Sequence, residues 1–250
     1  MSARPLEGAV RQRYLTVLRR PWHRRLREQA RDIIRGGLKL SRRPYVAFSC
    51  GKDSSVLAHM VMQQDPTVPL RFLSSGETRL LHDIDGVMQW FRERGAIIEE
   101  IHIDRVFSDE WRDATWDEQR RAGRHDLRRE LRPGYDAVFL GLRMEESPPR
   151  SMSLRKHQTA GLPPFVYRYS GGGLRICPLA AWRTDDVGAY LAEHGIPVLE
   201  AYHHEGLAAR TTARLTHDAV RHYALSYLYR RDPDSARRLL ARFPELRSAL

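Results

Sequence analysis

One short segment, residues 45–57, constrains the fold of this chain more than any other, because an apolar run stops there abruptly at small and charged residues. The apolar residues 45–48 predict a strand, and the apolar positions of residues 56–61 recur with the spacing of one helix face. A strand, a tight loop and a helix in this order leave unpaired backbone amides at the helix N-terminus. Such a terminus is typical of a phosphate-binding site.

The loop itself, residues 49–55, offers several groups to an anion. Its serine hydroxyls can donate hydrogen bonds, Lys52 adds a positive charge, and Gly51 allows a ligand to approach the backbone closely. The loop does not fit the Walker A pattern, because Asp53 follows the lysine where that pattern has serine or threonine. An ordinary strand–helix turn with a serine cap is the alternative. The candidate phosphate loop comprises Ser49, Cys50, Gly51, Lys52, Asp53, Ser54 and Ser55.

Length and composition exclude several classes of protein. The 250 residues are enough for one large domain or for a domain with appendages. No apolar run approaches the roughly 20 residues that span a bilayer, and the N-terminus lacks the apolar core of a secretory signal. Two cysteines form no disulfide framework and are typical of a reducing cytoplasm. They are also too few for a four-cysteine iron–sulfur cluster, so we expect no such cluster to be held by this chain alone, and no membrane partner.

The net charge of +11 is distributed unevenly along the chain. Residues 1–43 carry 13 Lys/Arg and 3 Asp/Glu, residues 44–204 carry 20 and 23, and residues 205–250 carry 9 and 5. The middle is therefore slightly acidic, whereas both ends are basic. Basic ends can neutralise the phosphates of DNA or RNA, and they can equally be solvated helix faces.

Strand and helix patterns alternate through the middle of the chain. Apolar runs predict four strands, with helices between them, near residues 45–49, 69–74, 96–103 and 136–142. Such alternation is typical of an α/β fold with a parallel sheet. Residues 151–176 read as a loop, in which three consecutive glycines indicate a mobile hairpin or lid.

Helical patterns flank this core. Residues 1–43 read as helices broken at Pro5 and Pro21, and Gly36-Gly37 is expected to weaken the last turn of the second helix. One apolar stripe of that helix can pack on the sheet with the arginines outward; it comprises Trp22, Leu26, Ile33, Ile34 and Leu38. We therefore expect a basic helical N-terminal arm (1–43), a nucleotide-binding α/β domain (44–204) and a helical C-terminal extension packed on the core (205–250).

Three strand ends carry the polar residues that chemistry requires: residues 49–55, 74–78 and 141–150. In open parallel sheets, ligands bind beyond the carboxyl ends of the strands. Arg143 and Arg150 can hold phosphate or sulfate oxygens with a two-pronged guanidinium, which lysine cannot do. Candidate Mg²⁺ ligands, acting through water, are Asp53, Glu77, Glu145 and Glu146, of which Asp53 is the predicted metal residue. Each of these side chains can also be an ordinary solvated loop charge.

Three elements of the chain, in matching order, resemble the phosphoadenosine phosphosulfate (PAPS) reductase family and the wider PP-loop ATP pyrophosphatase superfamily. Residues 49–54 are similar to the PP-loop, Ser-Gly-Gly-x-Asp-Ser, with Cys50 at the first glycine position. Residues 141–150 are similar to Gly-x-Arg-x-x-x-Ser-x-x-Arg, and residues 178–191 to Pro-Leu-x-x-Trp-x-x-x-Asp-Val-x-x-Tyr-Leu. The resemblance implies an adenine nucleotide alpha hydrolase-like fold (HUP, Rossmann-like), with a parallel sheet flanked by helices and helical appendages at both ends.

The resemblance also implies a set of site residues, in which the loop binds the phosphates or sulfate of an adenine nucleotide. Ser75, Gly76 and Glu77 occupy the position of the family's Asp-Thr-Gly…Pro-Glu-Thr loop, in a shorter copy. The predicted catalytic residues are Lys52, Arg143 and Arg150. The predicted nucleotide-binding residues are Ser49, Cys50, Gly51, Lys52, Asp53, Ser54, Ser55, Ser75, Gly76, Glu77, Gly141, Arg143, Glu145, Ser147 and Arg150.

One departure from the family separates this chain from its reductases. Those enzymes attack their substrate with a cysteine in a C-terminal Glu-Cys-Gly-x-His element, and no cysteine follows Cys177 here. Cys50 and Cys177 can carry a persulfide only if their pKa is lowered, and a small buried hydrophobe is the alternative for Cys177. The similar enzymes of DNA phosphorothioation carry cluster cysteines that this chain lacks.

These observations favour a Mg²⁺-dependent enzyme that cleaves ATP between the α and β phosphates, adenylates an acceptor and releases pyrophosphate. The acceptor stays open among sulfate, DNA and RNA, and a sulfur-donor protein is a candidate partner in sulfur transfer. Two alternatives are a sulfonucleotide reductase with an atypical cysteine and a nucleic-acid-binding protein whose nucleotide site only senses.

Overall fold

The computed structural model contains a six-stranded sheet within the residues that it describes: 3–75, 78–79, 82–103, 118, 134–156, 159, 161–168, 173–209, 222–242, 244 and 247. The strand order is β3-β2-β1-β4-β6-β5, and all neighbours pair in parallel except β5 with β6. The strands are β1 Pro44–Phe48, β2 Leu70–Ser75, β3 Ile98–Ile103, β4 Ala137–Phe139, β5 Val166–Arg168 and β6 Leu174–Ile176. The predicted α/β fold with a parallel sheet is confirmed.

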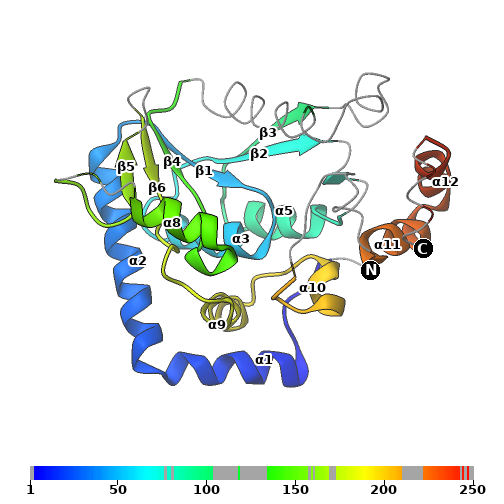
Figure 1. Cartoon of the computed structure of the whole chain (residues 1–250), viewed down its shortest axis with the longest axis horizontal. Helices are drawn as coiled ribbons and strands as arrows, with labels where there is room; N and C mark the ends of the chain where they lie inside the picture. The colour runs from blue at the N-terminus through cyan, green and yellow to red at the C-terminus, as the bar shows by residue number, and fades with distance from the viewer. Residues whose placement is uncertain are drawn as a thin grey trace.

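Helices α3, α5 and α9 lie on one side of the sheet, and α1 lies beneath α9 (Figure 1). Phe48, Phe72 and Phe91 meet edge-on between the sheet and these helices, and all three are buried. The predicted helix at 105–133 lies outside the described residues, apart from residue 118. The helices are α1 Gly8–Leu15, α2 Pro21–Leu40, α3 Lys52–Met62, α5 Asp85–Arg92, α8 Pro148–Lys156, α9 Thr184–His194, α10 Glu200–Glu205, α11 His222–Arg231 and α12 Pro233–Arg242, with short 3₁₀ turns η1 Thr16–Arg19 and η2 Met144–Glu146.

The prediction of a loop at residues 151–176 was wrong for much of that stretch. Helix α8 continues to Lys156, and strands β5 and β6 form an antiparallel pair that extends the sheet. This stretch contains Pro163, Pro164 and three consecutive glycines, which are typical of loops, and this explains why the sequence did not reveal the two short strands. The mobility expected of the glycine-rich connection stays a prediction, since Gly171 and Gly172 lie outside the described residues.

The N-terminal arm packs closely on the core. Ile33 and Ile34 of α2 are buried as predicted, whereas Trp22 is 49% exposed and does not belong to the packed stripe. The glycines of α2 do not shorten the helix, which runs to Leu40. A Cβ at Gly37 would lie 2.7 Å from Cδ1 of Ile176 in β6, so this glycine permits α2 to approach the sheet.

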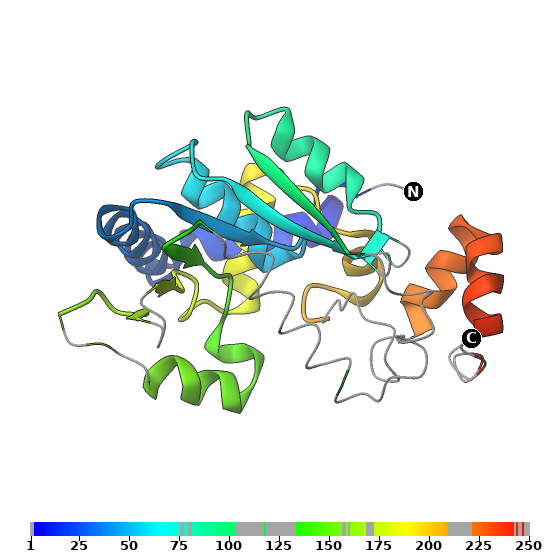
Figure 2. The same ribbon diagram turned by 90° about the horizontal axis from the view of Figure 1, so that it is seen from above.

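Helices α11 and α12 lie at one end of the molecule, beyond α10 and away from the sheet (Figures 1 and 2). Leu225 and Leu228 of α11 and Leu239 of α12 are buried. The division into arm, core and extension stays a prediction. None of the helices in the described ranges is long and apolar enough to cross a membrane.

Two histidines pack together where α3 meets α9. The rings of His59 and His194 lie 4.7 Å apart, and Nδ1 of His59 is 2.9 Å from the hydroxyl of Tyr190. Burial, followed by the charges of His194 and Arg94, lowers the pKa of His59 to about 4. Burial is also the main cause that lowers the pKa of His194.

This histidine pair predicts that the protein loses stability in mild acid. The unfolded chain takes up a proton on His59 near pH 6.5, whereas the folded chain resists it until about pH 4. Stability therefore falls as the pH drops through this window, by about 2–3 kcal/mol for His59. Urea unfolding at pH 7, 5.5 and 4 measures this slope. A His59→Gln variant should have a shallower slope, and an unchanged slope would contradict the assignment.

Candidate functional site

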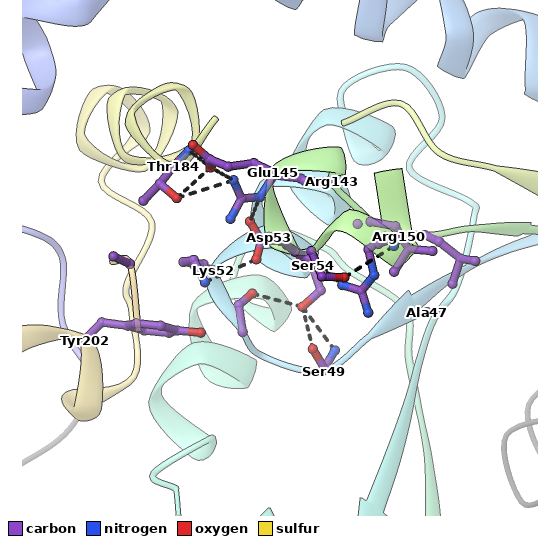
Figure 3. Close-up of a pocket in the computed structure, with 17 residues that line it drawn as sticks. Ala47, Ser49, Lys52, Asp53, Ser54, Arg143, Glu145, Arg150, Thr184 and Tyr202 are labelled. Carbon is purple, nitrogen blue, oxygen red and sulfur yellow. Dashed lines mark hydrogen bonds and ion pairs between the residues drawn. The ribbon is translucent and has the colours of Figure 1, made fainter. Parts of the chain in front are cut away.

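A pocket of about 670 Å³ opens beyond the carboxyl ends of β1 and β4 (Figure 3). The N-terminus of α3 forms one wall, and the chain from β4 through η2 into α8 forms another. The first residue of α9 and the helix α10 close the remaining sides. The lining residues are Ala47, Ser49, Gly51, Lys52, Asp53, Ser54, Leu140, Gly141, Leu142, Arg143, Glu145, Glu146, Ser147, Arg150, Thr184, Tyr202 and Ala208.

The loop before α3 is held in shape by serine hydroxyls. Oγ of Ser54 donates to the carbonyl of Gly51 at 2.9 Å and lies 3.0 Å from Oγ of Ser49. Cys50 has a φ of 57°, a left-handed conformation that favours glycine. Gly51 is the N-cap of α3, and no side chain caps this helix end. The amides of the first helical turn therefore face the pocket as a phosphate-binding loop requires.

Asp53 joins the loop to the neighbouring strand end. Its Oδ1 accepts a hydrogen bond from Nε of Arg143 at 2.7 Å, and its Oδ2 lies 3.3 Å from Nζ of Lys52. The side chain of Arg143 is only 4% exposed. A buried guanidinium requires such carboxylate partners, because an unpaired buried charge is strongly destabilising.

Glu145 is the second partner of Arg143 and reaches α9. Its Oε2 accepts hydrogen bonds from Nη1 of Arg143 at 2.6 Å, from the amide of Thr184 at 2.6 Å and from the hydroxyl of Thr184 at 2.9 Å. Partial burial alone would raise the pKa of Glu145, but the hydrogen bonds from Thr184 and Arg143 together outweigh it and lower this pKa. Glu145 is therefore a carboxylate at neutral pH.

Lys52 is held by a distant part of the chain that the sequence did not point to. Its Nζ donates to the carbonyl of Ala209 at 3.3 Å and lies 5.0 Å from the ring centre of Tyr202. No periodic pattern or charge links these segments in the sequence. Arg183 is the N-cap of α9 and Thr184 is its first helical residue, so the amide of Thr184 is available to donate to Glu145.

Ten of the fifteen predicted site residues line the pocket. Among the described side chains, Cys50 and Ser55 of the loop are buried and are not among the lining residues, and Ser75 is the last residue of β2. Gly76 and Glu77 lie outside the described residues. Arg150 lies at the rim, where 40% of its side chain is exposed and it pairs with Glu146. The ten lining residues are Ser49, Gly51, Lys52, Asp53, Ser54, Gly141, Arg143, Glu145, Ser147 and Arg150.

Both cysteines are buried and neither forms a disulfide. Burial raises the pKa of the Cys50 thiol well above its ordinary value and raises that of Cys177 to about 12. Each is therefore a protonated, weakly nucleophilic thiol at neutral pH.

The model of the phosphoadenosine phosphosulfate reductase domain family matches residues 43–231, which is most of the chain. The chain belongs to this family. The prediction of a PAPS reductase family protein with a PP-loop is thereby confirmed, as is that of an enzyme of the adenylyltransferase or reductase type.

Individual relatives are similar at low identity. Sulfate adenylyltransferase subunit 2 of Burkholderia lata is 26% identical over 216 residues, covering 71% of this chain and 67% of the relative. The protein of the same name from Chelativorans sp. is 28% identical over 205 residues, covering 71% and 66%. The chain thus spans about two thirds of the length of these relatives. Among solved structures, phosphoadenylyl-sulfate reductase from Candida auris has a TM-score of 0.48 at 17% identity, covering 82% of this chain and 95% of its own.

Two pocket glycines of this PAPS reductase family member, Gly141 and Gly51, are predicted to differ in how much stability is lost when each is replaced by alanine. A Cβ at Gly141 would lie 3.0 Å from the backbone carbonyl atoms of Asp53, which cannot rotate away. Gly141→Ala should therefore destabilise the protein by about 1–3 kcal/mol. A Cβ at Gly51 meets nothing closer than 3.4 Å, so the matched control Gly51→Ala should change stability by about 1 kcal/mol or less. Thermal unfolding compares them, and equal losses would contradict the close approach at Gly141.

The buried thiols give a second prediction. Folded protein at pH 7.5 should leave both Cys50 and Cys177 unmodified by iodoacetamide over minutes, and denatured protein should be modified at both, because burial raises both pKa values. Mass spectrometry of the digested protein measures each site. Rapid modification of either cysteine in the folded state would show that it is accessible as a thiolate.

Proposed function

We propose that this chain binds Mg²⁺–ATP in the pocket and transfers the adenylyl group to an acceptor oxygen, releasing pyrophosphate. The observation that carries the proposal is the meeting of an uncapped helix N-terminus, Lys52 and Arg150 around one cavity, while both cysteines lie buried outside it. Family membership and the names of the sulfate adenylyltransferase relatives support ATP as the nucleotide.

The charges of the pocket explain why the metal would arrive with the nucleotide. Three cations and three carboxylates line it, namely Lys52, Arg143, Arg150, Asp53, Glu145 and Glu146. A polyphosphate that entered alone would meet carboxylates that repel it, and Mg²⁺ is usually held by phosphates and one or two carboxylates. Asp53 fits this role poorly as arranged, because both of its oxygens face cations. Glu145 and Glu146 at the opposite wall are also paired, with Arg143 and Arg150, so whichever carboxylate meets a phosphate-bound ion would give up part of an ion pair.

The protein groups would divide the work between binding and charge neutralisation. The amides at the start of α3 and the hydroxyls of Ser49 and Ser54 would bind phosphate oxygens. Lys52, once released from the carbonyl of Ala209, would neutralise the charge that develops on the leaving pyrophosphate. Arg143 would keep its carboxylate partners and so fix the N-terminus of α3 against the segment after β4. Arg150 at the rim would contact the nucleotide or the acceptor.

The acceptor and the partners are open within this proposal. Sulfate is one candidate, and DNA or RNA and a sulfur-donor protein are others, in a cytoplasmic setting. A sulfonucleotide reductase is not favoured, because its chemistry needs an accessible thiolate and both thiols are buried with raised pKa values.

Pyrophosphate release tests the proposal directly. Purified protein with Mg²⁺–ATP and, in turn, sulfate, tRNA and DNA should release pyrophosphate and AMP or an adenylate with one of them. Lys52→Met should lower the rate by about 100-fold or more, as expected for loss of a charge at the leaving group. The matched control Lys156→Met removes an exposed lysine that does not line the pocket and should leave the rate unchanged. Tight ATP binding without any cleavage, with every acceptor, would instead indicate a sensing protein.

A further inference from the structure

The outward side of α2, together with η1 before it, carries a cluster of exposed cations that we call the arginine face. It comprises Arg19, Arg20, Arg24, Arg25, Arg31, Arg35 and Lys39, all exposed. Two acids, Glu28 and Asp32, share this surface, and Asp32 pairs with Arg35 at 2.7 Å. Figure 1 shows α2 along one edge of the molecule, where its outer side faces away from the sheet.

Packing of the arm does not require these charges. The inner side of α2 buries Ala30, Ile33, Ile34 and Gly37 against the core, and this contact alone explains why the helix is present. The family match begins at residue 43, so nearly all of the arm lies outside the matched residues. Residues 1–43 carry a net charge of +10, whereas residues 44–204 carry −3. The positive charge of the chain is therefore concentrated on this N-terminal arm.

The shape of this surface distinguishes between anionic partners. A helix that binds a lipid surface inserts an apolar side into the bilayer, but the apolar side of α2 is already buried in the core. Of its large apolar side chains, only Trp22 and Leu40 at opposite ends are exposed. The 20 residues of α2 span roughly 30 Å, the length along which one strand with the stacked geometry of a duplex places about nine phosphates.

Trp22 adds an aromatic surface at the start of this face. It is 49% exposed, and the guanidinium of Arg20 lies 4.9 Å from its ring centre. An exposed aromatic ring beside cations is the combination with which proteins stack an unpaired base and hold its phosphates.

We propose that the arginine face binds single-stranded nucleic acid, with its cations on the phosphates and Trp22 stacked on a base. The proposal does not depend on the nucleotide chemistry of the pocket. It rests on the exposure, length and charge of α2 and on the position of Trp22.

Binding of the full-length protein to fluorescent 20-nucleotide RNA and DNA strands, followed by anisotropy at several salt concentrations, tests the proposal. With about five phosphate contacts, log affinity should fall against log salt with a slope of about −3.5. Replacing Arg24, Arg31 and Lys39 by Gln should make this slope shallower by about 2 and weaken binding at least tenfold. The control triple Arg94→Gln, Arg155→Gln and Lys156→Gln makes the same charge change at exposed sites elsewhere and should bind normally.

A second variant separates stacking from general charge attraction. Trp22→Ala should weaken single-strand binding about tenfold and leave duplex binding within about twofold, because only an unpaired base can stack on the ring. Circular dichroism confirms that each variant is folded. The proposal is overturned if the wild type does not bind at 50 mM salt, if both triple variants weaken binding equally, or if vesicles of anionic lipid bind and nucleic acid does not. Pyrophosphate release, measured separately, is unaffected by any of these outcomes.

Discussion

The ion pair between Asp53 and Arg143 is the contact on which the candidate site depends. It connects the first turn of α3 to the segment after β4, which are 90 residues apart in the sequence. Arg143 then reaches Glu145, and Glu145 holds the first residue of α9. Since Gly141 allows the two backbones to touch, the charges meet at hydrogen-bond distance. Three elements that the sheet merely places nearby are thereby fixed around one cavity.

Secondary-structure elements with a repeating apolar pattern could be predicted from the sequence, whereas single long-range contacts could not. Apolar runs were enough to locate β1 to β4 and the helices α3 and α5, and polar strand ends together with the family resemblance were enough to predict ten pocket residues. The carbonyl of Ala209 on Lys52 and the ring of Tyr202 leave no such signal, because one backbone atom and one side chain have no periodicity. The antiparallel strand β5 was missed because it lies between two prolines and three glycines, which are typical of loops.

Cys50 shows how a departure from a motif can be structural. The loop requires a left-handed residue at this position, which glycine adopts without cost and cysteine adopts at roughly 1–2 kcal/mol. The thiol points into the core, where only 1% of the residue is exposed. Burial of the side chain offsets part of the backbone cost, so the substitution is tolerated without placing a thiol at the phosphates. The one cysteine inside the phosphate loop is therefore buried away from any ligand of that loop.

The burial of the two thiols and the contacts of Lys52 bear on the choice between ATP and a sulfonucleotide as the ligand. Both ligands present an adenylyl group joined to an anionic leaving portion, so a phosphate loop alone does not discriminate between them. Reduction requires a thiolate at the sulfur, and in the described part of the chain each thiol is buried and protonated. Cleavage between phosphates is assisted by a cation near the leaving group. Among the described residues, the contacts of Lys52 are a neutral carbonyl, an aromatic ring and a carboxylate shared with Arg143. An incoming phosphate offers that ammonium a stronger partner than a carbonyl does. The contacts of Lys52 are therefore compatible with the proposed adenylyl transfer, and the burial of both thiols is what argues against reduction.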